Sequence, residues 1–277
     1  MNQVTDGELL LIPCCLIEQG IHNVQPDTMR SPAGLDAPLT EEGRRQCAQL
    51  ARAVGSVSPD VIITSPLVRD QPSNRGPLFI TTLRQNVRRP WQTRTAQTAA
   101  LCFASQLKVG VPLVALESVR ETVNYLCDAR RPLSTIVADV RAQGGVVVDI
   151  SQGCLHEHDE LWASYERRHG SQEAFDRHRE SADLPALALR AREAFAWLAQ
   201  RPEREIVVVS HSAFLWNTLN MARVGQAAGV APVVDYGGDW ELEGWLSARF
   251  ENAEMRSVLC EFPAAAVLRP GSSEEMT

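Results

Sequence analysis

A histidine between two serines follows a continuous apolar run late in the chain. Ile206 to Val209 are all β-branched, and Ser210, His211 and Ser212 come directly after them. Such a run is typical of a strand buried on both faces in a parallel sheet. Ligands bind at the carboxyl edge of open α/β sheets, so His211 is the first candidate functional residue. The alternative is a histidine that only caps the helix following it.

Two other arrangements of reactive side chains in the sequence suggest chemistry. Ser210 or Ser212 beside His211 could form a serine hydrolase site, but the sequence has no G-x-S-x-G elbow, and adjacent residues at a strand end point apart. The spacing of Cys154, His156, His158 and Asp159 matches none of the usual zinc patterns. We therefore interpret that segment as a solvated approach to the helix around Trp162.

The elements around His211 alternate between strands and helices. Thr40 is expected to cap a helix with Glu41 and Glu42 in its first turn, an inner face containing Leu50, and an end at Gly55. A long surface loop is expected at 20–39. Further helices are expected at about 95–103, from 213 to 221, and before the central strand, where the inner face holds Leu187, Ala191, Phe195 and Leu198. Strands are expected at 9–17 (in spite of Pro13), 61–64, 111–116, 146–150 and, as an edge strand, 258–262.

This alternation predicts an α/β fold: a three-layer sandwich with a mostly parallel sheet and helices on both faces. The segment 117–131 is charged and irregular, and 68–93 shows neither helical nor strand periodicity. Without an internal repeat or a clear linker, we expect a single domain over residues 1–269. It would carry an inserted loop at about 70–94 and be followed by a disordered tail at 270–277.

Composition restricts the class of partner. The formal net charge of -7 argues against nucleic acid or an acidic membrane surface as the main partner. The seven cysteines are scattered without C-x-x-C spacing, which favours a reducing compartment. The apolar stretch at 9–17 is too short to span a bilayer. We expect a cytoplasmic protein that does not associate with membranes and needs no cofactor or metal.

Six short segments, taken in order, resemble the motifs of one family. GIHN at 20–23 and LDAPLTEEGRRQ at 35–46 come first. ITSPLVR at 63–69 and RTAQTA at 94–99 are similar to the two halves of one motif, S-P-L-x-R-T-x-Q-T-A. ESVRE at 117–121, with CD at 127–128, and VVVSHS at 207–212 complete the set. Together these segments resemble the histidine phosphatase superfamily, which has the phosphoglycerate mutase-like fold.

The resemblance implies a phosphoryl-transfer site for a small phosphorylated substrate. In this family a histidine attacks phosphorus, and the phosphohistidine is hydrolysed afterwards. Cationic groups neutralise the phosphoryl oxygens, and a carboxylic acid protonates the leaving oxygen. On this sequence the family's second histidine corresponds to His211 and its acid to Glu121. A phosphate-binding arginine corresponds to Arg69 or Arg94, and Asn23 would contact the phosphate or the substrate.

The nucleophilic Arg-His pair of the family does not appear at its expected place. Counting back from the GIHN segment puts Leu16 and Ile17 there, whereas counting from the strand puts Pro13 and Cys14 there. His22 corresponds to a histidine that accompanies the nucleophile in relatives. Cys14 or Cys15 could attack only as a thiolate, and nothing nearby in the sequence lowers the thiol pKa. Arg168-His169-Gly170 spells the motif but follows a helical run, so we interpret it as a helix end with Gly170 as the cap.

A second departure from the family pattern is the block from Asp70 to Arg94. Removing it joins Arg69 to Thr95 and gives SPLVRTAQTA, the uninterrupted motif. We hypothesise that this block, and the unusual first strand, are intron sequence retained in a gene model, which the transcript sequence would test. The functional expectation is therefore a phosphate-ester-binding protein of this family, hydrolysing the ester of a small metabolite. The alternative is an inactive pseudophosphatase that binds or regulates, because loss of a covalent nucleophile removes most of the rate.

Overall fold

The computed structural model describes residues 5–13, 39–66, 94–134, 147–153, 155–171 and 179–262. Within these ranges the strands form one six-stranded sheet in the order β4-β3-β2-β5-β1-β6. All neighbouring pairs are parallel except β1 with β6, which is antiparallel. The strands are β1 (Thr5–Pro13), β2 (Val61–Thr64), β3 (Leu113–Ala115), β4 (Val148–Asp149), β5 (Glu205–Ser210) and β6 (Arg256–Phe262).

Strand β5 lies in the middle of the sheet, between β2 and β1. Its side chains alternate between two separate hydrophobic clusters: Ile206 and Val208 belong to one, and Val207 and Val209 to the other. The continuous apolar run therefore arises because both faces of this strand are covered. This confirms the prediction of a doubly buried central strand.

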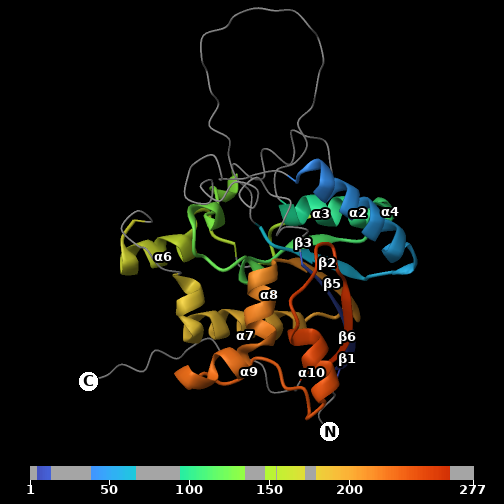
Figure 1. Cartoon of the computed structure of the whole chain (residues 1–277). Coiled ribbons are helices and arrows are strands. Elements are labelled where there is room, and N and C mark those ends of the chain that lie inside the picture. The colour runs from blue at the N-terminus through green and yellow to red at the C-terminus, as the bar shows by residue number, and fades with distance from the viewer. Residues whose placement is uncertain are drawn as a thin grey trace, which may run out of the picture.

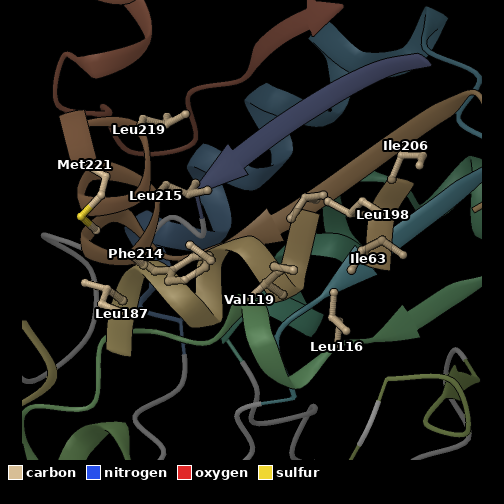
Figure 2. Packing of buried hydrophobic residues seen from close by; sticks show 14 of the residues in the cluster. Ile63, Leu116, Val119, Leu187, Leu198, Ile206, Phe214, Leu215, Leu219 and Met221 are labelled. Carbon is tan, nitrogen blue, oxygen red and sulfur yellow. The ribbon is translucent and has the colours of Figure 1, made fainter. Parts of the chain in front are cut away.

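Helices cover both faces of the sheet (Figure 1). Cys47 of α2 (Glu41–Ala53) and Ala99 of α3 (Arg94–Cys102) pack in one cluster. On the other face, Leu187 of α7 (Leu184–Ala199) packs with Phe214 and Leu215 of α8 (Ser212–Leu219), as Figure 2 shows. The three-layer α/β fold is thus confirmed. The other α-helices in the described part of the chain are α4 (Ala104–Lys108), α6 (Glu160–His169), α9 (Met221–Val224) and α10 (Trp240–Ser247).

Most helix predictions are confirmed in position. Thr40 caps α2, since its hydroxyl accepts a hydrogen bond from the N–H of Gly43 at 3.1 Å. The last residue of this helix is Ala53, so Gly55 lies in the short 3-10 turn that follows. On α7, Leu187, Ala191 and Leu198 are buried and Phe195 packs partly buried against them. The sequence pattern missed the short helices α4 and α10.

Three strand predictions and one loop prediction need correction. The first strand begins at Thr5 rather than Leu9, and its described part ends at Pro13, which pairs in register with Ser210. Pro13 thus occupies the end of the strand, where a missing N–H costs little. The loop expected at 20–39 does not stay on the surface throughout, because Leu39 is buried and donates its N–H to Gln97. Strands β3 and β4 are shorter than expected.

The charged segment 117–131 is more deeply buried than its sequence indicates. It contains two 3-10 turns, Glu117–Val119 and Leu126–Asp128. Arg120, Arg130 and Asp128 in it are buried. Charge in the sequence therefore marks internal ion pairs here rather than a solvated surface. No helix within the described ranges is long and apolar enough to cross a bilayer. Residues 70–93 and the tail at 270–277 lie outside the described residues, and the single domain stays a prediction.

Candidate functional site

His211 lies at the carboxyl end of β5, where the strand turns into α8. Its backbone is extended, with φ -128° and ψ 149°, and its carbonyl accepts the N–H of Leu215 at 3.0 Å. The residue is the N-cap of α8, but its imidazole makes no capping hydrogen bond. Only 1% of His211 is exposed. The imidazole is therefore buried at the sheet edge and does not cap this helix through its ring nitrogens.

Glu121 reaches the same helix terminus from a different part of the chain. Its Oε1 accepts hydrogen bonds from the N–H of Phe214 at 2.9 Å and from that of Thr122 at 2.8 Å. Phe214 is the third residue of α8, so the carboxylate supplies the capping acceptor that the side chain of His211 does not. The N-terminal end of a helix also favours a negative charge. The structure thus places the predicted acid in the turn that begins at His211.

The end of β5 is joined to the segment that carries Glu121 by a second contact. Ser210, fully buried, donates its hydroxyl to the carbonyl of Val119 at 2.7 Å. The two serines beside His211 are therefore not equivalent, and Ser210 is a structural hydrogen-bond donor. This geometry gives no support to a serine nucleophile at that position.

Arg94 begins α3 at the neighbouring strand end. The hydroxyl of Thr95 donates to the carbonyl of Ser65 at 3.1 Å, and Ser65 follows β2. Ser65 in turn donates its N–H to the carbonyl of Val209 at 3.3 Å. The backbone of Arg94 therefore starts a helix anchored at the same carboxyl edge as His211. Arg69 and Asn23, the other predicted phosphate-binding residues, lie outside the described residues.

An ion-pair network holds the segment 117–131, which carries Glu121 and is called the acid-bearing segment below. The guanidinium of Arg120, which is fully buried, donates to Asp159 at 2.7 Å and 3.0 Å and also pairs with Glu117. Burial alone would lower the pKa of Arg120, but the charges of Glu117 and Asp159 raise it overall. Burial would raise the pKa of Asp159, yet Arg120 and the N–H groups of Trp162 and Arg130 hold it below its ordinary value. Both groups therefore stay ionised, and Asp159 caps α6 instead of lying in solvent as expected.

A second ion pair, missed in the sequence, holds the segment nearer to Glu121. Arg190 of α7 bonds with Glu180 through Nε at 2.7 Å and Nη2 at 2.8 Å. A signal for it exists in the sequence, since Arg190 shares a helical face with the apolar residues Leu187 and Ala194. The partner cannot be read from periodicity, because Glu180 lies outside that helix.

Two further groups of sequence candidates that fall at least partly on described residues are not brought into a site. Gly170, with φ 78°, ends α6, so Arg168-His169-Gly170 is a helix terminus as predicted. His156 and His158 are exposed. No group of three or more His, Cys, Asp or Glu side chains in the described part of the chain could hold a metal ion.

Comparison with known proteins finds similar proteins of the histidine phosphatase and phosphoglycerate mutase-like kind. A model of the histidine phosphatase superfamily (branch 1) matches residues 25–74. "Phosphoglycerate mutase-like protein 1" of Arabidopsis thaliana is 28% identical over 214 residues, which cover 73% of this chain and 68% of the relative. A second "phosphoglycerate mutase-like protein" of the same plant is 26% identical over 253 residues, which cover 87% of this chain and 80% of the relative. Among solved structures, a phosphoglycerate mutase from Bacillus anthracis aligns with a TM-score of 0.47 at 13% identity. The alignment covers 94% of this chain and 90% of the mutase chain.

Proposed function

We propose that this chain, which is similar to members of the histidine phosphatase superfamily, binds phosphomonoesters of small metabolites and hydrolyses them. The site is the carboxyl edge of the sheet at the end of β5. One observation carries the proposal: the carboxylate of Glu121 bonds to the first turn of the helix that begins at the buried His211. Residues that are remote in sequence, and that suit phosphoryl transfer, thus meet at one helix terminus.

Each side chain has a role that its chemistry allows. The imidazole of His211 donates a hydrogen bond to a non-bridging phosphoryl oxygen and offsets its charge. Glu121 gives a proton to the leaving oxygen as the attacking group, an enzyme nucleophile or water, bonds to phosphorus and the bond from phosphorus to that oxygen breaks. Arg94 or Arg69, with Asn23, completes the phosphate contacts. Arginine suits this role because its planar N–H groups match two phosphate oxygens at once.

The same site could also bind phosphate esters without turning them over. The described part of β1 ends at Pro13, which pairs with Ser210, one residue before His211. The sequence continues with Cys14 and Cys15, so the strand end does not supply the family's nucleophilic imidazole. This favours a second candidate function, a pseudophosphatase that binds phosphorylated metabolites or regulates a partner.

One paired experiment separates these functions. Hydrolysis of 4-nitrophenyl phosphate and binding of vanadate are measured for the wild type, for His211→Ala and for the control His158→Ala, whose side chain is exposed. We expect turnover and vanadate binding in the wild type, both lost in His211→Ala and both kept in His158→Ala. Vanadate binding without turnover would select the pseudophosphatase. Absence of both in the folded wild type would contradict a phosphate site.

If the wild type turns over, the nucleophile can be located by trapping. A brief reaction with substrate, an acid or alkaline quench and peptide mapping would locate a phosphorylated side chain. Candidates are His22, Cys14 and Cys15, and a phosphocysteine differs from a phosphohistidine in acid stability. A cytoplasmic location also belongs to this proposal and is supported by the scattered cysteines of the sequence.

A further inference from the structure

Arg190 uses its whole guanidinium group inside the protein. Nε and one N–H of Nη2 bond with the two oxygens of Glu180. Nη1 donates to the carbonyls of Ser118 and Arg120, both at 2.9 Å, and Nη2 also donates to the carbonyl of Glu121 at 3.4 Å. These contacts occupy all five N–H donors that an arginine has. Three carbonyls of the acid-bearing segment therefore converge on one side chain.

Glu180 holds the other side of the same segment. It is 1% exposed, and its Oε2 accepts the N–H of Val123 at 2.8 Å. Its own N–H donates to the carbonyl of Val123 at 3.3 Å. Arg190 and Glu180 thus bond with the backbone on both sides of Glu121, at residues 118, 120, 121 and 123. A buried pair with so many backbone contacts fixes the course of the segment as well as its charge balance.

The pair also touches the helix that Glu121 caps. The guanidinium of Arg190 lies over the ring of Phe214, 4.5 Å from its centroid. The N–H of Phe214 is the donor to Oε1 of Glu121. Arg190 therefore contacts both partners of that hydrogen bond, the residue that donates and the residue that accepts.

We propose that Arg190, held by Glu180, is a positioning residue for Glu121. It fixes the backbone of the acid on one side and the ring of Phe214 on the other, so that Oε1 stays bonded to α8 and Oε2 carries the proton toward the leaving oxygen. This inference rests on the proposed hydrolysis. It adds residues on α7 and the preceding turn to the machinery of the site, without direct contact to the substrate.

The test uses two substrates that differ in their need for an acid. An alkyl phosphate such as glycerol phosphate releases a strongly basic alkoxide and requires protonation, whereas 4-nitrophenolate leaves without it. Arg190→Lys keeps the charge but has three donors on one point, so it cannot bond with Glu180 and three carbonyls together. We expect kcat for glycerol phosphate to fall about 10-fold or more, because the variant loses a part of the rate that general acid catalysis contributes. For 4-nitrophenyl phosphate, kcat should change less than about 3-fold.

Arg192→Lys is the matched control. Arg192 lies on the same helix and bonds with the carbonyls of Ala231 and Pro232, away from Glu121. This variant should leave both substrates near wild-type rates. Equal losses for both substrates in Arg190→Lys, or no loss for either, would overturn the positioning role. A purely structural arginine would give one of those two results.

A second variant guards against misfolding. Arg190→Met combined with Glu180→Gln removes both buried charges, which is often tolerated, and keeps an amide oxygen for the N–H of Val123. It should show the same selective loss of glycerol phosphate turnover. Hydrogen exchange of residues 118–123 and Phe214 is measured in parallel and should speed up in both variants. If the folded wild type turns over neither substrate, the proposed hydrolysis fails, while unchanged exchange in the variants would separately refute the positioning of this segment.

Discussion

At the scale of single residues, one oxygen of Glu121 is bonded to the start of α8. Oε1 accepts two backbone N–H groups, those of Thr122 and Phe214, and the hydroxyl of Thr122 at 3.4 Å. Because these hydrogen bonds occupy the lone pairs of Oε1, we expect Oε2 to carry the proton in the proposed reaction. Under the proposed function, one oxygen would anchor the side chain and the other would transfer the proton.

Glu121→Gln tests this division of roles. Glutamine keeps a carbonyl oxygen for the two N–H groups but has no proton to give. We expect kcat for an alkyl phosphate to fall about 100-fold, while vanadate affinity stays within a few-fold of wild type. The basic limb of the pH–rate profile should disappear with it. A variant that retains the alkyl phosphate rate would show that Glu121 is not the acid.

At the scale of elements, buried ion pairs decide how the acid-bearing segment is held. Asp159 caps α6 and pairs with Arg120, and its side chain is 7% exposed. Its ordinary pKa of 3.8 is lowered in the fold. A lowered carboxylate pKa contributes stability above the unfolded value, and that stability is lost as the pH falls through the folded value.

Asp159→Asn should therefore flatten the acid side of the stability profile. At pH 7 the variant leaves Arg120 with the partly buried Glu117 as its remaining partner, so it should lose less unfolding free energy than the about 3–5 kcal/mol that a buried charge without any partner costs. The difference from wild type should shrink as the pH falls below about 4, because the carboxylate of the unfolded chain then takes up a proton while that of the folded protein, whose pKa is lowered, is still ionised. Urea unfolding between pH 3 and pH 7 measures this. A difference that stays constant over that range would rule out the charge of Asp159 as its source.

The cap of α2 gives a smaller, local prediction. The hydroxyl of Thr40 accepts the N–H of Gly43. Thr40→Ala should cost about 1 kcal/mol of unfolding free energy, and Thr40→Ser should cost little because serine caps equally well. Thermal or urea unfolding of the three proteins decides this, and equal stability of the alanine variant would show that the cap is unimportant.

The elements also show what the sequence could predict. The strand at 205–210 was predictable because burial on both faces leaves a continuous β-branched run. Helix α7 was predictable because one core face imposes a 3.6-residue repeat. The burial of 117–131 was not predictable, because Arg120 finds its partner Asp159 across 39 positions. Periodicity reports which residues face a core, but it does not report which charges meet inside it.

At the scale of the whole molecule, the block from Asp70 to Arg94 separates two halves of one family motif. Helix α3 begins at Arg94, and Thr95 is anchored to Ser65. Deleting residues 70–94 would place Arg69 directly before Thr95. In that variant Arg69 would take the place in the sequence that Arg94 has in the full chain. The two candidates for the phosphate-binding arginine, Arg69 and Arg94, therefore correspond to one position at the start of α3.

The deletion variant should fold and keep the site. A shorter connection loses less entropy on closure, about 0.6 kcal/mol less for each halving of its length. We expect an unfolding midpoint at or above that of the full chain and unchanged vanadate affinity. An unfolded or non-binding deletion variant would show that the block is an integral part of the domain.

The site as a whole was predictable only in part. The order of the motifs led to His211 and Glu121, which the structure brings to one helix terminus. The pair formed by Arg190 and Glu180 was missed, because its role depends on three-dimensional contacts with backbone carbonyls. Arg69 and Asn23 stay predictions, as does catalysis itself.

A crystal structure of the protein with bound vanadate would show where a phosphate-like anion binds. We expect the anion at the carboxyl edge of the sheet, with an oxygen within hydrogen-bonding distance, about 3 Å, of the His211 imidazole. The carboxylate of Glu121 should lie on the side of the leaving oxygen. Vanadate bound elsewhere, with His211 remote from it, would show that this edge of the sheet is not the phosphate site.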